Sequence, residues 1–229
     1  MSIAKAGDDA GSVIYISDNI AVDVSRRFIT LSKKSLVTED IVAIEFASAL
    51  DEVGVSYTVV AGYVAILFGR SRRSDDIDFI VEQMDMDSFL DLCRVLRERG
   101  FDVMQGDICD PGSLRRLYER YLAEAYAVRF MYRDVVIPNI EFRFAKTLLH
   151  KYSIENSLVV ILNNRYRIRI APLELQIAYK LFMGSNKDVG DAVFLYTLFK
   201  PILQRNEIRG WCEQLGIDCS LLEEVAESG

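Results

Sequence analysis

The stretch from 59 to 81, VVAGYVAILFGRSRRSDDIDFIV, constrains the fold of this chain more than any other. An apolar strand ends there at Gly62, and a second apolar strand carries Asp76 and Asp78 two residues apart. Side chains at i and i+2 of a strand share a face, so both carboxylates project the same way while the residues between and after them enter the core. The stretch therefore predicts a sheet with two acids on one face.

This acid pair needs a partner of opposite charge. Two carboxylates on one strand face repel each other unless a cation lies between them. Mg²⁺ is the usual cation for one or two carboxylates that act together with substrate phosphates. Asp76 and Asp78 are therefore candidate Mg²⁺ ligands. The alternative is a solvated strand end that binds nothing.

The segment before the acid pair adds a second constraint. Residues 63–68 predict a short helix, and the loop after it holds Arg70, Arg72 and Arg73. A glycine, a short intervening segment and an acid-apolar-acid-apolar strand resemble the nucleotidyltransferase superfamily of the DNA polymerase β type. The matching residues are Ala61, Gly62 and Tyr63 and, after twelve more residues, Asp76, Ile77, Asp78 and Phe79.

The resemblance implies an α/β fold, with a mixed sheet flanked by helices, and a nucleoside triphosphate bound together with Mg²⁺ at the acid pair. Gly62 would let the backbone approach the phosphates, while Arg70 and Arg73 would counter their charge. Tyr63 departs from the family, which prefers Gly or Ser at this nucleotide-binding position. Metal binding is therefore a firmer expectation than triphosphate binding.

The same resemblance implies a third acid on a later strand. Residues 135–144, VVIPNIEFRF, alternate apolar and polar side chains, which predicts a half-buried strand with Glu141 off its core face. Glu141 is the candidate third metal ligand and would also assist deprotonation of the acceptor hydroxyl. Two alternatives stay open: a solvent-facing Glu141 paired with Arg143, or Asp134 in the preceding turn as the third acid.

The chain divides into two parts by its pattern. Residues 1–171 read as an α/β core with a β-hairpin near its start, and residues 172–229 read as a helical region because their apolar residues recur at helical spacing. Segments around the boundary resemble the AbiEii-type branch of the same superfamily, whose members include toxins of bacterial and archaeal toxin-antitoxin pairs. These segments are IAPLE at 170–174, AYKL at 178–181 and KDVGD at 187–191.

In that branch a helix lysine and a downstream aspartate help to form the active site. By position, Lys180 matches the lysine, and Asp188 or Asp191 matches the aspartate. A helix lysine that faces a cleft can pair with a triphosphate as a compact point charge. The resemblance also implies an antitoxin protein as a partner. The alternative for Lys180 is a surface lysine at the edge of a core helix.

Composition limits the class of protein. With 229 residues, 51% of them hydrophobic, the chain can bury a sizeable core, and its net charge of −7 argues against nonspecific coating of nucleic acid. The four cysteines show no Cys-x-x-Cys spacing and His150 is the only histidine, so no zinc set is expected. We expect reduced core thiols and a cytoplasmic protein. The uncharged stretch 53–69 is at the short limit for a membrane span and contains several glycine and polar residues, so a buried strand and helix explain it better. The N-terminus has no signal-peptide pattern.

Two basic clusters could serve an RNA acceptor, because phosphate neutralisation needs local density of positive charge. One is the strand with Arg165, Arg167 and Arg169 on one face, and the other is a helix with Arg115, Arg116 and Arg120. Basic runs that are only solvated faces are the alternative.

Taken together, the sequence predicts a Mg²⁺-dependent nucleotidyltransferase that moves a nucleoside monophosphate from a nucleoside triphosphate to a hydroxyl of RNA, protein or a small molecule. Two rivals remain. A metal-dependent glycosyltransferase also uses Asp-x-Asp, but it requires neither the Gly62 segment nor a later acid. A noncatalytic relative that binds nucleotide or a partner would keep the fold and lose the chemistry, and Tyr63 favours this view.

Overall fold

The computed structural model describes residues 13–220 and 222. Within them a mixed sheet of ten strands follows the order β1-β2-β3-β9-β10-β4-β5-β8-β7-β6. The strands are β1 (Val13–Ser17), β2 (Ile20–Asp23), β3 (Phe28–Leu31), β4 (Tyr57–Val60), β5 (Asp76–Val81), β6 (Phe101–Val103), β7 (Val128–Tyr132), β8 (Val135–Phe144), β9 (Leu158–Leu162) and β10 (Tyr166–Ile170).

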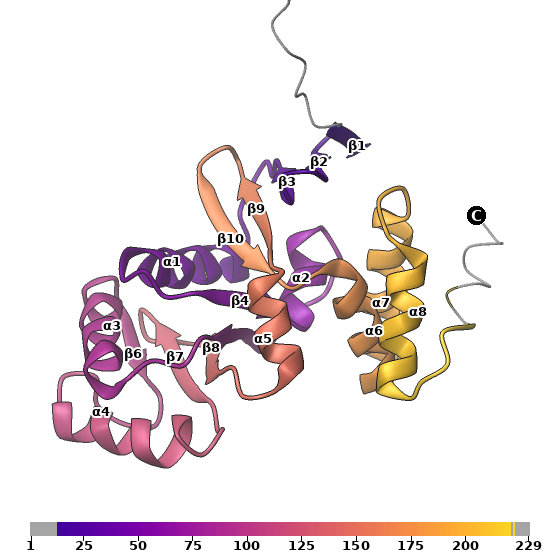
Figure 1. Cartoon of the computed structure of the whole chain (residues 1–229). Helices are drawn as coiled ribbons and strands as arrows, with labels where there is room; N and C mark the ends of the chain where they lie inside the picture. The colour runs from indigo at the N-terminus through magenta and orange to yellow at the C-terminus, as the bar shows by residue number, and fades with distance from the viewer. Residues whose placement is uncertain (1–12, 221, 223–229) are drawn as a thin grey trace, which may run out of the picture.

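Helices flank this sheet and then form a separate group at the C-terminal end, at the right of Figure 1. They are α1 (Thr38–Glu52), α2 (Gly62–Leu67), α3 (Met86–Glu98), α4 (Pro111–Leu117) with the π-helical turn η1 (Tyr118–Leu122), α5 (Leu148–Glu155), α6 (Leu173–Met183), α7 (Asn186–Phe199) and α8 (Arg205–Leu215). The predicted fold class, a mixed sheet flanked by helices and followed by a C-terminal helical region, is confirmed.

The predicted N-terminal hairpin is also confirmed. Strands β1 and β2 pair antiparallel, and β3 continues the sheet beside β2 before pairing with β9. Helices replace strands from Leu173 onward, where α6 begins. The division into domains at 1–171 and 172–229 stays a prediction, and residues 1–12, 221 and 223–229 lie outside the described part of the chain.

The centre of the sheet determines where the acids lie. Strand β5 pairs antiparallel with β4 and parallel with β8, and Asp78 is the register partner of Glu141. Strand β7 pairs antiparallel with β8, and Arg129 is the register partner of Glu141 on its other side. Register partners on adjacent strands share a face of the sheet. Three charged side chains therefore form one row across β5, β8 and β7.

The opposite face of these strands is the main core. Phe46 of α1 is fully buried, with ring centroids 4.9 to 6.1 Å from those of four phenylalanines on the sheet. These are Phe79, Phe101, Phe130 and Phe142. Because side chains alternate along a strand, an apolar residue buried against α1 leaves its neighbours on the other face. The packing of Phe79 and Phe142 thus fixes the acids opposite α1.

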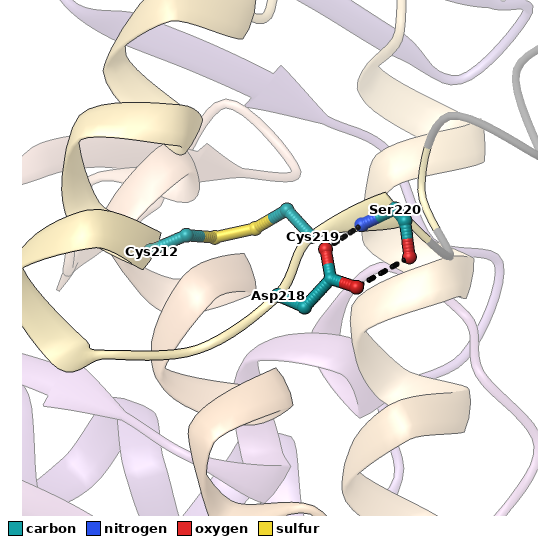
Figure 2. Close-up of a disulfide and its surroundings, with 4 residues drawn as sticks. All are labelled: Cys212, Asp218, Cys219 and Ser220. Atoms are coloured by element: carbon teal, nitrogen blue, oxygen red, sulfur yellow. Dashed lines mark hydrogen bonds between the residues drawn. A yellow bond between two sulfur atoms is a disulfide. The ribbon is translucent and has the colours of Figure 1, made fainter.

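The expectation of four reduced core thiols is wrong. Helix α8 ends at Gly216, whose left-handed backbone turns the chain back, and Ile217 N then donates to Cys212 O at 3.0 Å. This return brings Cys219 to a Cα–Cα distance of 6.3 Å from Cys212, and a disulfide joins the two (Figure 2). Of the others, Cys93 is buried and free, whereas Cys109 is exposed and free. The cysteine argument for a cytoplasmic location therefore fails.

Beside the disulfide, Asp218 forms a local turn that holds the returning segment. Its carboxylate accepts hydrogen bonds from the backbone N–H and the hydroxyl of Ser220, each at 2.8 Å (Figure 2).

Within the described part of the chain, no helix has both the length and the apolar character needed to cross a bilayer. The uncharged stretch 53–69 instead contains strand β4 and helix α2, joined at Ala61.

Phe46→Ala tests the packing that fixes the acid-bearing face. We expect the free energy of unfolding to fall by about 3–5 kcal/mol, because the substitution removes a buried ring and leaves a cavity. Urea denaturation measures the change. The control is Tyr15→Ala, whose side chain is 78% exposed and whose substitution should change stability by no more than about 0.5 kcal/mol. Equal effects would show that Phe46 does not anchor α1.

Candidate active-site cleft

A cleft of about 420 Å³ opens where the acid-bearing face of the sheet meets helices α5 and α6. Of the residues predicted from the sequence, Gly62, Asp76, Asp78, Lys180 and Asp188 line it. These residues come from α2, β5, α6 and α7, so the cleft joins the sheet to the C-terminal helical region.

Asp76 and Asp78 share one face of β5, as their spacing predicts, while Ile77 between them is fully buried. Burial, followed by the negative charge of Asp76, raises the pKa of Asp78 to about 7, although Arg143 and Lys180 oppose the rise. A carboxyl group with this pKa is stabilised as an anion by an added cation. The pair therefore fits one divalent cation that it shares with substrate phosphates.

Glu141 lies on the same face as this pair, as predicted, but its carboxylate is already occupied. Arg129 donates from Nε at 3.0 Å and from Nη2 to Oε1, and Arg143 donates from Nη2 to Oε2. The described residues accordingly contain no group of three acid, histidine or cysteine side chains arranged to hold a metal. Glu141 is therefore not free to join Asp76 and Asp78 in this arrangement, and the three-carboxylate metal set stays a prediction.

The alternative for Glu141, pairing with Arg143, is the arrangement that forms. Glu141 is nevertheless buried, at 8% exposure, and does not face solvent. Asp134, the other candidate for the third acid, is exposed in the turn between β7 and β8.

A strained turn links β4 to α2 at the edge of the cleft. Ala61 adopts φ 63° and ψ −135°, a conformation that is costly for a residue with a Cβ. The buried amide of Gln176 binds both polar groups of this residue: Nε2 donates to Ala61 O at 2.8 Å, and Oε1 accepts from Ala61 N at 3.3 Å. Gln176 therefore positions the turn. Its only signal in the sequence is a polar residue among the apolar positions of α6.

Gly62 follows this turn and is required by a close contact. A Cβ at Gly62 would lie 2.6 Å from Arg72 Nη2 and 3.0 Å from Ser74 Oγ. The absence of a side chain therefore lets Arg72 cross the start of α2. Tyr63 was predicted at a nucleotide-binding position, but its side chain is fully buried and donates to Asp40 Oδ1 at 3.0 Å. It does not point into the cleft, so its bulk does not obstruct a nucleotide there.

A buried carboxylate connects the loop after α2 to the helical region. Asp191 of α7 has no exposed surface, and three cations contact it: Arg70 Nε at 2.8 Å, Arg72 Nη2 at 2.6 Å and Lys180 Nζ at 3.0 Å. Lys180 also pairs with Asp188 at 2.6 Å. We call these five residues the Asp191 cluster. Two acids and three bases leave it with one net positive charge beside the cleft.

Within the cluster, Asp188 lines the cleft and keeps its charge. Burial alone would raise the pKa of Asp188, but the hydrogen bonds from Lys180 and Ser185 hold it below its ordinary value. Lys180 has three N–H donors, and two of them are directed at Asp188 and Asp191. One donor of the lysine is left for a ligand in the cleft.

Four residues predicted to bind nucleotide do not line the cleft: Tyr63, described above, and Arg70, Arg73 and Asp191. Arg70 contacts Asp191 and donates to Gly190 O, Asp191 is fully enclosed, and Arg73 is exposed on a neighbouring hollow. Direct contact of these side chains with a nucleotide is therefore not supported. Arg72, predicted only as one member of the basic loop, is the loop arginine that lines the cleft.

The neighbouring hollow has a volume of about 1090 Å³ and shares Arg72 and Ser74 with the cleft. Lys33, Lys34 and Arg73 also line it. The two arginine clusters predicted for an RNA acceptor, at 165–169 and 115–120, line neither space.

His150 of α5 lines the cleft and was missed as a site residue, because an isolated histidine gives no motif. Burial, and then the charge of Arg143, lowers its pKa. The imidazole is therefore neutral at pH 7 and does not add to the positive charge of the cleft.

Asp191→Asn tests whether the Asp191 cluster holds the cleft together. The change leaves three cations beside a neutral amide, so we expect the free energy of unfolding to fall by about 3 kcal/mol or more. Chemical denaturation gives the value. Glu98→Gln, which removes an exposed pair with Arg94, should cost no more than about 1 kcal/mol. A cost for Asp191→Asn as small as that of the control would contradict the role of the cluster.

Comparison with known proteins supports the architecture. No family model and no curated protein sequence matches the chain. Its structure is similar to the crystal structure of an antigenic nucleotidyltransferase-like protein from Paracoccidioides brasiliensis, with a TM-score of 0.51 and 14% sequence identity. The match covers 82% of this chain and 91% of the other. At this identity the likeness concerns the fold, and the chain has a nucleotidyltransferase-like fold.

Proposed function

We propose that the chain is a Mg²⁺-dependent nucleotidyltransferase that moves a nucleoside monophosphate from a nucleoside triphosphate to an acceptor hydroxyl. The acceptor is RNA, a protein or a small molecule. The observation that carries the proposal is one cleft in which the Asp76 and Asp78 pair lies together with the Gly62 turn and Lys180. The nucleotidyltransferase-like fold supports the same activity.

The chemistry divides between the acid pair and the cationic side of the cleft. Asp76 and Asp78 would hold Mg²⁺, which when bound would supply positive charge to the phosphate oxygens during an in-line displacement. The remaining N–H of Lys180 donates to a phosphate oxygen, and Arg72 adds a second cation in the cleft. Asp188 contributes indirectly by orienting Lys180. The reaction releases pyrophosphate.

Glu141 has a different part in this proposal from the one expected of it. Its two carboxylate oxygens already accept hydrogen bonds from the guanidinium groups of Arg129 and Arg143. Glu141 is therefore not proposed as the group that deprotonates the acceptor hydroxyl. It is proposed to hold Arg143 beside the acid pair.

The AbiEii-type resemblance extends the proposal to a toxin of a toxin-antitoxin pair with an antitoxin protein as partner. Support comes from the pairing of Lys180 with Asp188 at the cleft, since these are the lysine and one of the two aspartates that the resemblance indicates. We further propose a cytoplasmic location, because nucleoside triphosphates are cytoplasmic substrates. The Cys212–Cys219 disulfide is the observation against that location.

A noncatalytic relative of the same fold is the second candidate. The arginine-bound Glu141 favours it, because a nucleotide sensor does not need a third free acid. The glycosyltransferase alternative has less support, since the Gly62 turn and the Asp78–Glu141 register are features that it does not require.

The double change Asp76→Asn and Asp78→Asn tests the metal-binding role. Incubation with labelled nucleoside triphosphates, Mg²⁺ and total RNA or protein extract should label an acceptor with the unaltered chain and leave it unlabelled with the double variant. The reason is that amides lack the charge that holds Mg²⁺. Asp87→Asn, on the exposed start of α3, is the matched control and should retain labelling. Undiminished labelling by the double variant would rule out the assignment.

Lys180→Ala tests the contact with phosphate. Calorimetry should show a loss of triphosphate affinity of roughly tenfold or more and little change for the nucleoside, because the lost hydrogen bond is with phosphate charge. Lys151→Ala, an exposed lysine of α5, should change neither affinity. Equal losses for the two ligands would mean that Lys180 only supports the packing of α6.

A further inference from the structure

Four charged side chains of the acid-bearing face form a connected series across three strands. Asp78 on β5 and Arg129 on β7 are both register partners of Glu141 on β8. Arg143 lies two residues beyond Glu141 and therefore shares its face. Two arginines are thus interleaved with the second and third acids of the motif.

Arg143 lies between two of those acids. Its Nη2 atom donates to Glu141 Oε2 and lies 3.5 Å from Asp78 Oδ1. The guanidinium lies there although its buried Nε atom has no hydrogen-bond partner among the described residues, which is costly. Attraction to the two carboxylates is therefore what holds it.

Glu141 has little capacity left for another partner. A carboxylate offers about four acceptor positions. Two N–H groups of Arg129 and one of Arg143 already use three of them. A metal ion could bind Glu141 only by displacing an arginine.

We propose that Arg143 supplies a permanent positive charge between Asp78 and Glu141, where a second divalent cation would lie, so that the cleft takes one divalent cation, on Asp76 and Asp78. A guanidinium stays protonated at every relevant pH, so its charge cannot be withdrawn. In two-metal sites the second metal lies about 3.5–4 Å from the first. Arg143 Nη2 lies 3.5 Å from Asp78 Oδ1, so its positive charge would repel a second ion placed there. The inference rests on the proposed function only in taking the cleft as a metal site.

With Arg143 in this position, the acceptor hydroxyl would contact a guanidinium group and not a second metal ion. A second metal would lower the pKa of the hydroxyl, whereas a guanidinium donates hydrogen bonds to the oxygen and cannot take its proton. The acceptor would therefore need a hydroxyl whose proton leaves to solvent or to another group in the cleft.

Counting bound Mn²⁺ tests the inference without nucleotide or turnover. The full chain is titrated with Mn²⁺, and free ion is measured by electron paramagnetic resonance. We expect one Mn²⁺ per unaltered chain, none for the Asp76→Asn and Asp78→Asn double variant, and two for Arg143→Met, which keeps much of the length and removes the charge. Arg143→Gln should also give two. Arg143→Lys, which keeps the charge, and Arg94→Met, which alters an exposed arginine of α3, should each give one.

Two bound ions, or none, on the unaltered chain would overturn the inference, and this measurement needs no variant to fold. A folded Arg143→Met chain that still binds one ion would also overturn it. The Arg129→Met chain should still bind one Mn²⁺. If it binds two while the Arg143 variants bind one, then Arg129 and not Arg143 excludes the second ion, which contradicts the inference. If the unaltered chain binds one Mn²⁺ but transfers no nucleotide, the inference holds and the proposed function fails. If it binds two Mn²⁺ and transfers nucleotide, the proposed function holds and the inference fails.

Discussion

The buried charge of Asp191 is the interaction on which the cleft depends. Its carboxylate contacts Arg70 and Arg72 from the loop after α2 and Lys180 from α6, so one side chain joins segments about 110 residues apart. A buried carboxylate is tolerated only when it is fully paired, and here the partners also set the geometry of their surroundings. Arg72 crosses Gly62 on its way to Asp191, which places the start of α2 relative to the acid pair.

The sheet contributes the other half of the arrangement through its register. The row from Asp78 to Glu141 to Arg129 exists because the alternate residues of the same strands are buried against Phe46. A shift of one residue in any of these strands would exchange the apolar and charged faces. The same strand register therefore produces both the aromatic core and the row of charged residues in the cleft. Packing of the aromatic core keeps the charged residues in their places.

The sequence predicts the structure correctly where the periodicity of neighbouring residues determines it. The face shared by Asp76 and Asp78, the strand that carries Glu141 and the helical region after 171 all follow from alternation or helical spacing. The position of that strand beside β5 was implied by the family resemblance and not by a local period. The sequence was insufficient where side chains meet across the fold. The pairing of Glu141 with Arg143 was an open alternative from their spacing. Nothing local shows that Arg129 binds Glu141, that Asp191 is enclosed, or that the chain after Gly216 returns to bring Cys219 to Cys212. Tyr63 gave a misleading indication because the pattern specifies a position and not the direction of its side chain.

The two hydrogen bonds between Gln176 and Ala61 connect α6 to the turn that precedes Gly62. Gln176 and Lys180 are four residues apart and lie on one face of the helix, one turn from each other. One holds the backbone of the turn before Gly62, and the other holds the acids of α7. Helix α6 therefore positions both the turn before Gly62 and the acids of α7 at the cleft. A displacement of α6 would therefore disturb the contacts of Gln176 with the turn and those of Lys180 with α7 together.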